Sequence, residues 1–163
     1  MKKRVDMSIW SFLLTTIIIV YLIGMFVWLY RDGETRALSW VILGMLVLML
    51  IPSLIWMPLN VELKGDWLLV RRPLKVKAIP LAEIESVRQM PPTMGAIRLC
   101  GSGGFMGYWG WYREGDIGKY FAYYGRSSDA FLVTLCDGSK YMLGCRDAGE
   151  MVAAIAAGIE KQL

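Results

Sequence analysis

Histidine is absent from this 163-residue chain, and charged residues make up only 20% of it. Without histidine the chain cannot form a Ser–His–Asp triad, a Cys–His catalytic pair or a histidine-ligated metal site. The cysteines, Cys100, Cys136 and Cys145, form no CxxC motif, and their odd number argues against a disulfide framework. We therefore expect a non-enzymatic protein with no metal ion and no cofactor.

The charged residues, basic or acidic, are also too few to indicate a nucleic-acid-binding surface or a catalytic site. The formal net charge is +4, but no long basic run accompanies it, so we expect no nucleic-acid partner. Glu83 and Glu85 share a face of a predicted strand, and nothing near them suggests a pocket. Glu114 and Asp116 lie in a glycine-flanked turn, where we expect them to contact solvent. Neither pair predicts general acid–base catalysis.

Apolar residues are present in excess. They make up 56% of the chain, against about 45–50% in an ordinary soluble domain. Residues 7–30 and 37–61 carry no charged side chain, and each run exceeds the roughly 20 residues that cross a bilayer. We predict a transmembrane helical hairpin within residues 1–59, with spans at about 8–30 and 37–58. The aromatic residues near the ends of these runs are candidate membrane-interface anchors: Trp10, Trp28, Tyr30, Trp40 and Trp56.

The distribution of basic residues predicts the orientation of this hairpin. Lys2, Lys3 and Arg4 precede the first span, and a second basic group follows the second span. The loop between the spans carries only Arg31 and Arg36. By the positive-inside rule we expect a multi-pass protein of the inner (cytoplasmic) membrane with both termini in the cytoplasm.

Residues 60–163 have the pattern of a small β-domain. Strands are expected at residues 61–63 and 67–71, and an Asp137-Gly138 turn predicts a hairpin. Residues 74–78 alternate with period two, which predicts Leu74, Val76 and Ala78 facing inward.

An amphipathic helix is expected at about residues 147–162. Asp147 is its expected N-cap and Glu150 completes a capping box. An apolar stripe at helical spacing follows, comprising Met151, Val152, Ile155, Ile159 and Leu163. The fold class is thus α+β: a transmembrane hairpin, then a small β-barrel or sandwich capped by a C-terminal helix.

Two segments carry a resemblance to a known family. They are the run from Ile79 to Val87 and the glycine-aromatic run from Gly101 to Arg113, each within the strand hairpins that precede the terminal helix. With the N-terminal hairpin, they resemble bacterial pleckstrin-homology-like (PH-like) membrane proteins. The resemblance implies a PH-like fold over most of the chain from about residue 60. It implies no particular ligand.

Two groups of residues are candidate binding surfaces. The glycine-aromatic segment, residues 101–125, is open to three interpretations: core packing, a loop resting among lipid headgroups, or a protein-docking patch. Its candidate lipid or partner surface comprises Phe105, Tyr108, Trp109, Trp111, Tyr112 and Arg113. The candidate contacts to anionic headgroups are Arg71, Arg72, Lys75 and Lys77, which a solvated strand face would also explain.

These observations favour a membrane-anchored interaction module at the cytoplasmic membrane surface. Its expected partners are membrane lipids, together with a protein partner or a second copy of the chain. The alternative is an accessory subunit of a larger membrane complex, and an enzyme is the least favoured class.

Overall fold

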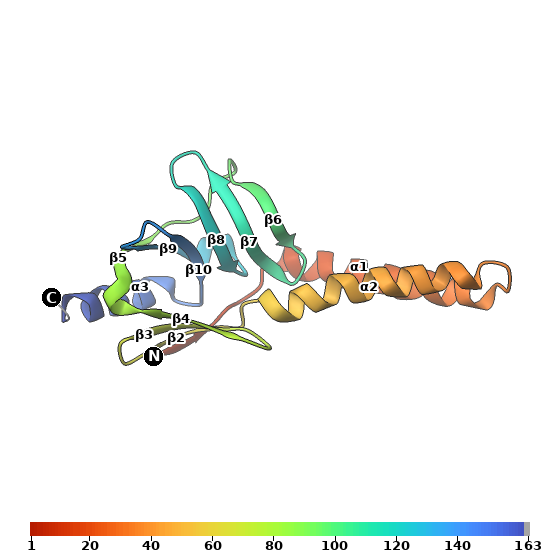
Figure 1. The fold of residues 1–163 in the computed structure, drawn as a ribbon, viewed down its shortest axis with the longest axis horizontal. Coiled ribbons are helices and arrows are strands. Elements are labelled where there is room, and N and C mark those ends of the chain that lie inside the picture. The colour runs from red at the N-terminus through yellow and green to blue at the C-terminus, as the bar shows by residue number, and fades with distance from the viewer. Residues whose placement is uncertain (162–163) are drawn as a thin grey trace.

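The computed structural model describes residues 1–161, and its most extended part is a helical hairpin. Helix α1 covers Ile9–Arg31 and helix α2 covers Arg36–Trp56. Ser8 caps α1 by accepting a hydrogen bond from the Ser11 N–H. Both helices are long and apolar enough to cross a membrane, and few of their residues are buried. Figure 1 shows them projecting side by side from the rest of the molecule. The prediction of two long apolar helices is confirmed, and α2 continues through Pro52.

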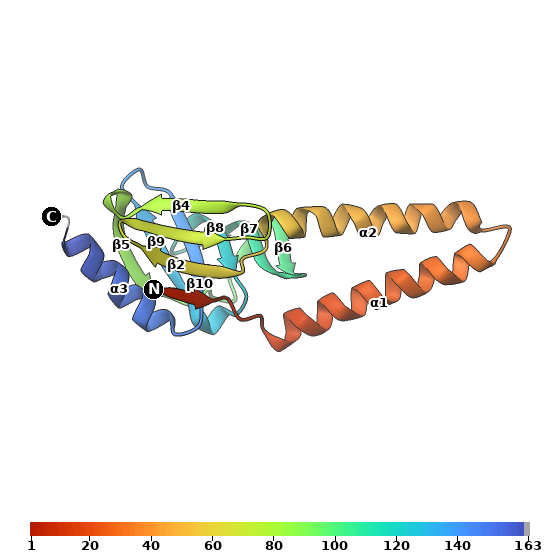
Figure 2. The same ribbon diagram turned by 90° about the horizontal axis from the view of Figure 1, so that it is seen from below.

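A short strand precedes the helical hairpin, and the sequence did not predict it. Strand β1, Lys2–Arg4, pairs antiparallel with β2, Asn60–Lys64, so that Lys3 lies opposite Val61. The four-stranded sheet has the order β1-β2-β3-β4, with β3 at Trp67–Arg71 and β4 at Val76–Pro80. The helical hairpin is thus inserted between two neighbouring strands. Both of its ends lie on the same side, next to the sheets (Figure 2). We use the term β-domain for β1 together with the described residues from Asn60 onward.

The second sheet has six strands in the order β5-β9-β10-β8-β7-β6. Strands β8 and β10 are parallel, and the other neighbouring pairs are antiparallel. The Asp137-Gly138 hairpin joins β9 to β10 as expected. Within residues 1–161 the two sheets do not close into a barrel. The strands are β5 (Ile84–Gln89), β6 (Ile97–Gly104), β7 (Gly107–Glu114), β8 (Gly118–Tyr124), β9 (Ala130–Leu135) and β10 (Lys140–Gly144).

Helix α3, Ala148–Glu160, packs against the core of the β-domain. Asp147 is the N-cap residue, as predicted, but the predicted capping box is wrong, because neither side chain caps the helix. The carboxylates of Asp147 and Glu150 instead accept hydrogen bonds from Lys3 Nζ at 2.8 and 2.7 Å. These contacts tie β1 to the start of α3. The predicted helix end at residue 162 and the predicted stripe residue Leu163 lie outside the described residues. The central core residues are Val61, Leu68, Val70, Ile79, Phe131, Val133, Leu143, Met151 and Ile155, none more than 1% exposed.

Strand β4 presents the opposite face to the one predicted. Ile79 is buried, whereas Leu74 and Val76 are 68% and 49% exposed, and Ala78 is also exposed. The reason is the register, which pairs Ile79 with the buried Leu68. Side chains alternate between the two faces of a strand, so a prediction that is wrong by one residue puts every side chain on the wrong face. The outer side of this sheet therefore carries exposed apolar residues.

Candidate functional site

The glycine-aromatic segment forms strands β6, β7 and β8, and most of its rings are core residues. Tyr112, Tyr120 and Tyr124 are each at most 5% exposed and lie on one face of the sheet. Phe121 and Tyr123 are buried on the other face. Burial raises the pKa of Tyr112 and of Tyr123 to about 12, because the phenolate loses hydration. The core-packing interpretation therefore describes these rings.

Gly101 and Gly110 lie opposite each other on β6 and β7, and both have a φ of +120°. A Cβ on Gly101 would lie 2.2 Å from the Trp109 carbonyl oxygen. A Cβ on Gly110 would lie 2.2 Å from the Cys100 carbonyl oxygen. Residues with a side chain rarely adopt this φ and cannot enter this space. The glycine pair thus permits a backbone approach that sets the path of the β6–β7 hairpin.

The tip of the β6–β7 hairpin (104–107) lies against α1 and is hydrogen-bonded to it. Ser11 Oγ donates to the Gly104 carbonyl and accepts from the Gly107 N–H at 3.1 Å. Thr15 Oγ1 accepts from the Met106 N–H at 2.9 Å. Ser11 is only 1% exposed, so its two bonds are shielded from water. Two polar side chains of an otherwise apolar helix thus form hydrogen bonds with backbone groups of the tip.

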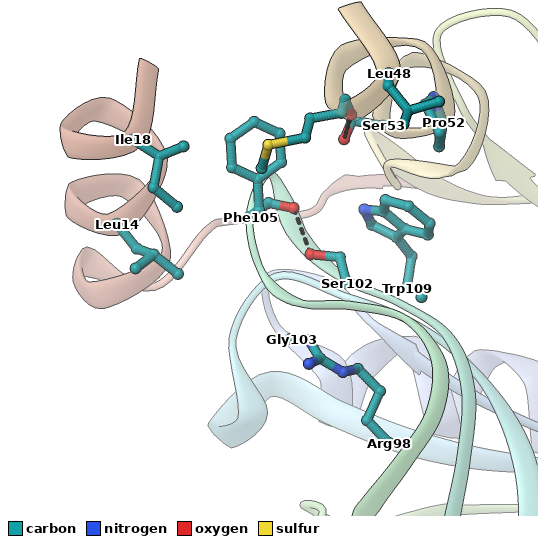
Figure 3. Close-up of a pocket in the computed structure, with 12 residues that line it drawn as sticks. Leu14, Ile18, Leu48, Pro52, Ser53, Arg98, Ser102, Gly103, Phe105 and Trp109 are labelled. Atoms are coloured by element: carbon teal, nitrogen blue, oxygen red, sulfur yellow. Dashed lines mark hydrogen bonds between the residues drawn. The ribbon is translucent and has the colours of Figure 1, made fainter. Parts of the chain in front are cut away.

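A groove with a volume of about 350 Å³ opens between the tip and both helices. Phe105 and Trp109 contribute from the β6–β7 hairpin, and Figure 3 shows the Phe105 ring between the two helices. Seen as in Figure 2, α1 and α2 lie close at their connecting loop and diverge toward the β-domain, where the tip lies. The helices contribute Leu14, Ile18, Leu48, Met49, Pro52 and Ser53.

Two polar groups of this groove lack a partner among residues 1–161. Trp109 Nε1 is buried and has no hydrogen-bond acceptor. In Figure 3 its indole N–H points into the space between Phe105 and Ser53. Arg98 is exposed, and its guanidinium lies against Gly103 at the lower side of the groove and forms no ion pair within the described chain.

The end of α2 is fixed to the β-domain by aromatic stacking. The Trp56 ring lies 5.3 Å from the Phe121 ring, measured between centroids. The guanidinium of Arg72 lies 5.0 Å from the Trp56 ring and 5.5 Å from the Tyr123 ring, at cation–π distance. Trp56, expected as a membrane-interface anchor, is half-buried and packs against the core of the β-domain. Trp10, Trp28, Tyr30 and Trp40 are exposed on the helical hairpin.

The structure does not bring the four candidate basic residues together. Arg71 pairs with Glu62 at 2.6 Å, and Arg72 stacks on Trp56. Lys77 lies over the Tyr141 ring. Only Lys75 is both exposed and without such a contact in the described chain, in the turn between β3 and β4. This turn lies near the end of α2, because the Leu59 N–H donates to the carbonyl of Arg71.

The candidate aromatic surface is likewise divided. Phe105 and Trp109 line the groove, Tyr108 stacks on Tyr124, and Tyr112 belongs to the core. Trp111 is 41% exposed and lies under Lys119 Nζ. Arg113 is exposed at the other end of β7, away from the tip.

Several residues of this site were not singled out from the sequence. The hydrogen bonds of Ser11 and Thr15 join them to residues more than 80 positions away in the sequence. Arg98 belongs to the site because it lines the groove. No local sequence pattern distinguishes these three residues. Glu114, expected to contact solvent, is only 3% exposed and accepts a hydrogen bond from the Thr93 N–H. Within residues 1–161, no group of three Cys, Asp or Glu side chains could hold a metal ion.

Comparison with known proteins identifies the β-domain. Neither a curated protein nor a solved structure gives a significant match. A family model described as bacterial PH domain matches residues 59–158, which is more than half of the chain. That range begins just after α2 and ends within α3, so it covers both sheets apart from β1. The chain therefore belongs to the bacterial PH domain family.

Proposed function

We propose that this protein is a membrane-anchored interaction module that works at the cytoplasmic face of the inner membrane. PH-like domains are in general binding rather than catalytic domains, and the role proposed here is also binding. The observation that carries the proposal is the attachment of the β-domain to the helical hairpin at three places. These are strand β1 before α1, the stack of Trp56 at the end of α2, and the β6–β7 tip between the helices. The β-domain is thus held in one orientation against the end of the hairpin.

The helical hairpin has the dimensions of a membrane anchor. Trp10 and Trp28 are both exposed and lie about 27 Å apart along α1, close to the thickness of a hydrocarbon core. The β-domain end carries the basic β1 strand before α1 and further Lys and Arg residues after α2, whereas the connecting loop carries only Arg31 and Arg36. The positive-inside rule then favours a cytoplasmic β-domain and two cytoplasmic termini.

The turn between β3 and β4 is the proposed contact with lipid headgroups. Its exposed residues are Pro73, Leu74 and Lys75, and it lies near the point where α2 ends. An apolar side chain beside a lysine suits the boundary between acyl chains and anionic headgroups. One such lysine contributes about 1 kcal/mol near an anionic leaflet.

Cysteine labelling of the full chain in spheroplasts tests this arrangement. One variant keeps Cys136 alone, with Cys100→Ser and Cys145→Ala, and a second adds Gly33→Cys to a background that also carries Cys136→Ser. An impermeant maleimide should label Gly33→Cys in intact spheroplasts and Cys136 only after lysis. The reverse pattern, or recovery of the chain in the soluble fraction, would contradict the proposal.

The outer side of the first sheet favours a second candidate, the accessory subunit of a membrane complex. Trp67 and Val76 are 48% and 49% exposed there, and β4 is an edge strand. Exposed apolar surface beside an unpaired strand edge is suited to a protein partner. A complex of fixed stoichiometry that dissociates in Val76→Lys, but not in Ser139→Lys, would support this candidate. A monomeric wild-type chain in mild detergent would count against it.

A further inference from the structure

The groove between the helices and the β6–β7 hairpin is apolar on one side and charged on the other. Its upper walls are helix side chains that also face outward, since Leu14 and Leu48 are 43% and 73% exposed. In a membrane these walls are continuous with the hydrocarbon layer. Arg98 lies at the opposite side, beside Gly103 (Figure 3).

A second hollow of about 520 Å³ lies on the opposite face of the β6–β7 hairpin, next to the edge strand β6. Arg98 and Gly103 line both spaces. The second hollow is lined by more polar groups, which come from the β-domain rather than from the helices: Thr93, Tyr108, Tyr112, Tyr124 and Ser127. The guanidinium of Arg98, on the edge strand β6, therefore lies between an apolar space and a more polar one, and both volumes are within the range of about 300–1,000 Å³ of small-molecule sites.

This arrangement matches the order of groups along a phospholipid. An acyl chain suits the walls formed by Ile18 and Phe105. The buried Trp109 N–H, which has no acceptor among residues 1–161, can donate to an ester carbonyl. Arg98, which has no carboxylate partner in the described chain, can bind a phosphate through two parallel hydrogen bonds.

We propose that the groove binds one anionic phospholipid, with an acyl chain between α1 and α2 and its phosphate on Arg98. The inference rests on the proposed function, because only a membrane-inserted hairpin brings the groove into contact with phospholipid. A bound lipid would also fill the space between the diverging helices and so stabilise the position of the β6–β7 hairpin.

Native mass spectrometry of the delipidated full chain in mild detergent tests the proposal. Phosphatidylglycerol is titrated against phosphatidylcholine with matched acyl chains, and glycerol phosphate is offered as a competitor. We expect one phosphatidylglycerol per chain, bound at least tenfold more tightly than phosphatidylcholine and not displaced by glycerol phosphate. Equal affinity for the two lipids would overturn the charge-reading role of Arg98. Displacement by glycerol phosphate would reduce the site to an anion site without a lipid chain.

Variants of three groove residues test separately the proposed contacts to the phosphate, the ester carbonyl and the acyl chain. Arg98→Gln should lower phosphatidylglycerol affinity about tenfold or more, the loss expected for a charge-assisted hydrogen bond. Its matched control is Arg113→Gln, which removes the same charge from an exposed position away from the groove. Trp109→Phe, which removes only the N–H donor and the second ring, should weaken both lipids. Ile18→Trp should block the acyl chain, whereas Val20→Trp, on an exposed position outside the groove, should not.

The outcomes distinguish this inference from the proposed function. The inference is wrong if Arg98→Gln and Arg113→Gln lower the affinity for phosphatidylglycerol to the same extent, or if a second protein copy rather than lipid occupies the groove. Neither result affects the labelling pattern of Gly33→Cys and Cys136, which tests the proposed function. If the labelling pattern itself fails, both the proposed function and the lipid site are wrong.

Discussion

Replacing Ser11 by alanine should detach the β6–β7 tip from α1. The hydroxyl satisfies two backbone groups of the tip, the Gly104 carbonyl and the Gly107 N–H. Alanine leaves both without this partner, and water is largely excluded because Ser11 is 1% exposed. A buried polar group left unpaired costs about 1–3 kcal/mol, so the free energy of unfolding should fall by about 2–6 kcal/mol.

Ser39→Ala is the matched control for this change. Ser39 is also a buried helix serine, but its hydroxyl donates only to Arg36 within its own helix, at 2.6 Å. The assay is reversible unfolding of the full chain in mixed detergent micelles, with hydrogen–deuterium exchange at Met106 and Gly107. Ser11→Ala should both lower stability and speed exchange at these two amides. Equal stability of the two variants, with unchanged exchange at the tip, would refute the reasoning.

Three further changes test other parts of the structure. Gly110→Ala should lower the free energy of unfolding by at least about 1–3 kcal/mol, because the φ of Gly110 is +120° and the added Cβ would meet a carbonyl oxygen. Gly24→Ala is the control, because a Cβ on Gly24 would enter open space and should not lower stability. Thermal unfolding measures both variants. Arg72→Gln should loosen the stack on Trp56, seen as faster exchange at the end of α2. The free energy of unfolding should fall as the pH rises from 10 to 12, because burial raises the pKa of Tyr112 and of Tyr123 to about 12. In this range the folded chain keeps phenol protons that the unfolded chain loses. The absorbance of the phenolate follows the transition.

The helices and the hairpin that have a strong local sequence pattern were predicted correctly. Two uncharged apolar runs predicted α1 and α2, because a bilayer-length helix needs only length and composition. The Asp137-Gly138 turn predicted the β9–β10 hairpin, because these residues adopt the turn conformation readily. The period of apolar residues predicted α3.

Elements that depend on tertiary contacts were not predicted. Strand β1 has three basic residues and no apolar period, and it forms because β2 offers an edge beside it. The inward face of β4 is set by its register with β3, which residues 74–78 alone do not determine. The site depends on Ser11 and Thr15 reaching a tip more than 90 residues away, and no local signal encodes that pairing.

The most direct test of the account is the depth of the β6–β7 tip in a bilayer. A spin label at Met106→Cys, in a background with Cys100, Cys136 and Cys145 replaced, is compared with one at Ser139→Cys in full-length protein reconstituted in anionic lipid. Thr15, which binds the Met106 N–H, lies about 9 Å along α1 from its start. We predict that the Met106 label is more accessible to oxygen than to a water-soluble nickel complex, and that the Ser139 label shows the opposite. Equal, water-like accessibility of both labels would contradict a β-domain that inserts its hairpin between two membrane helices.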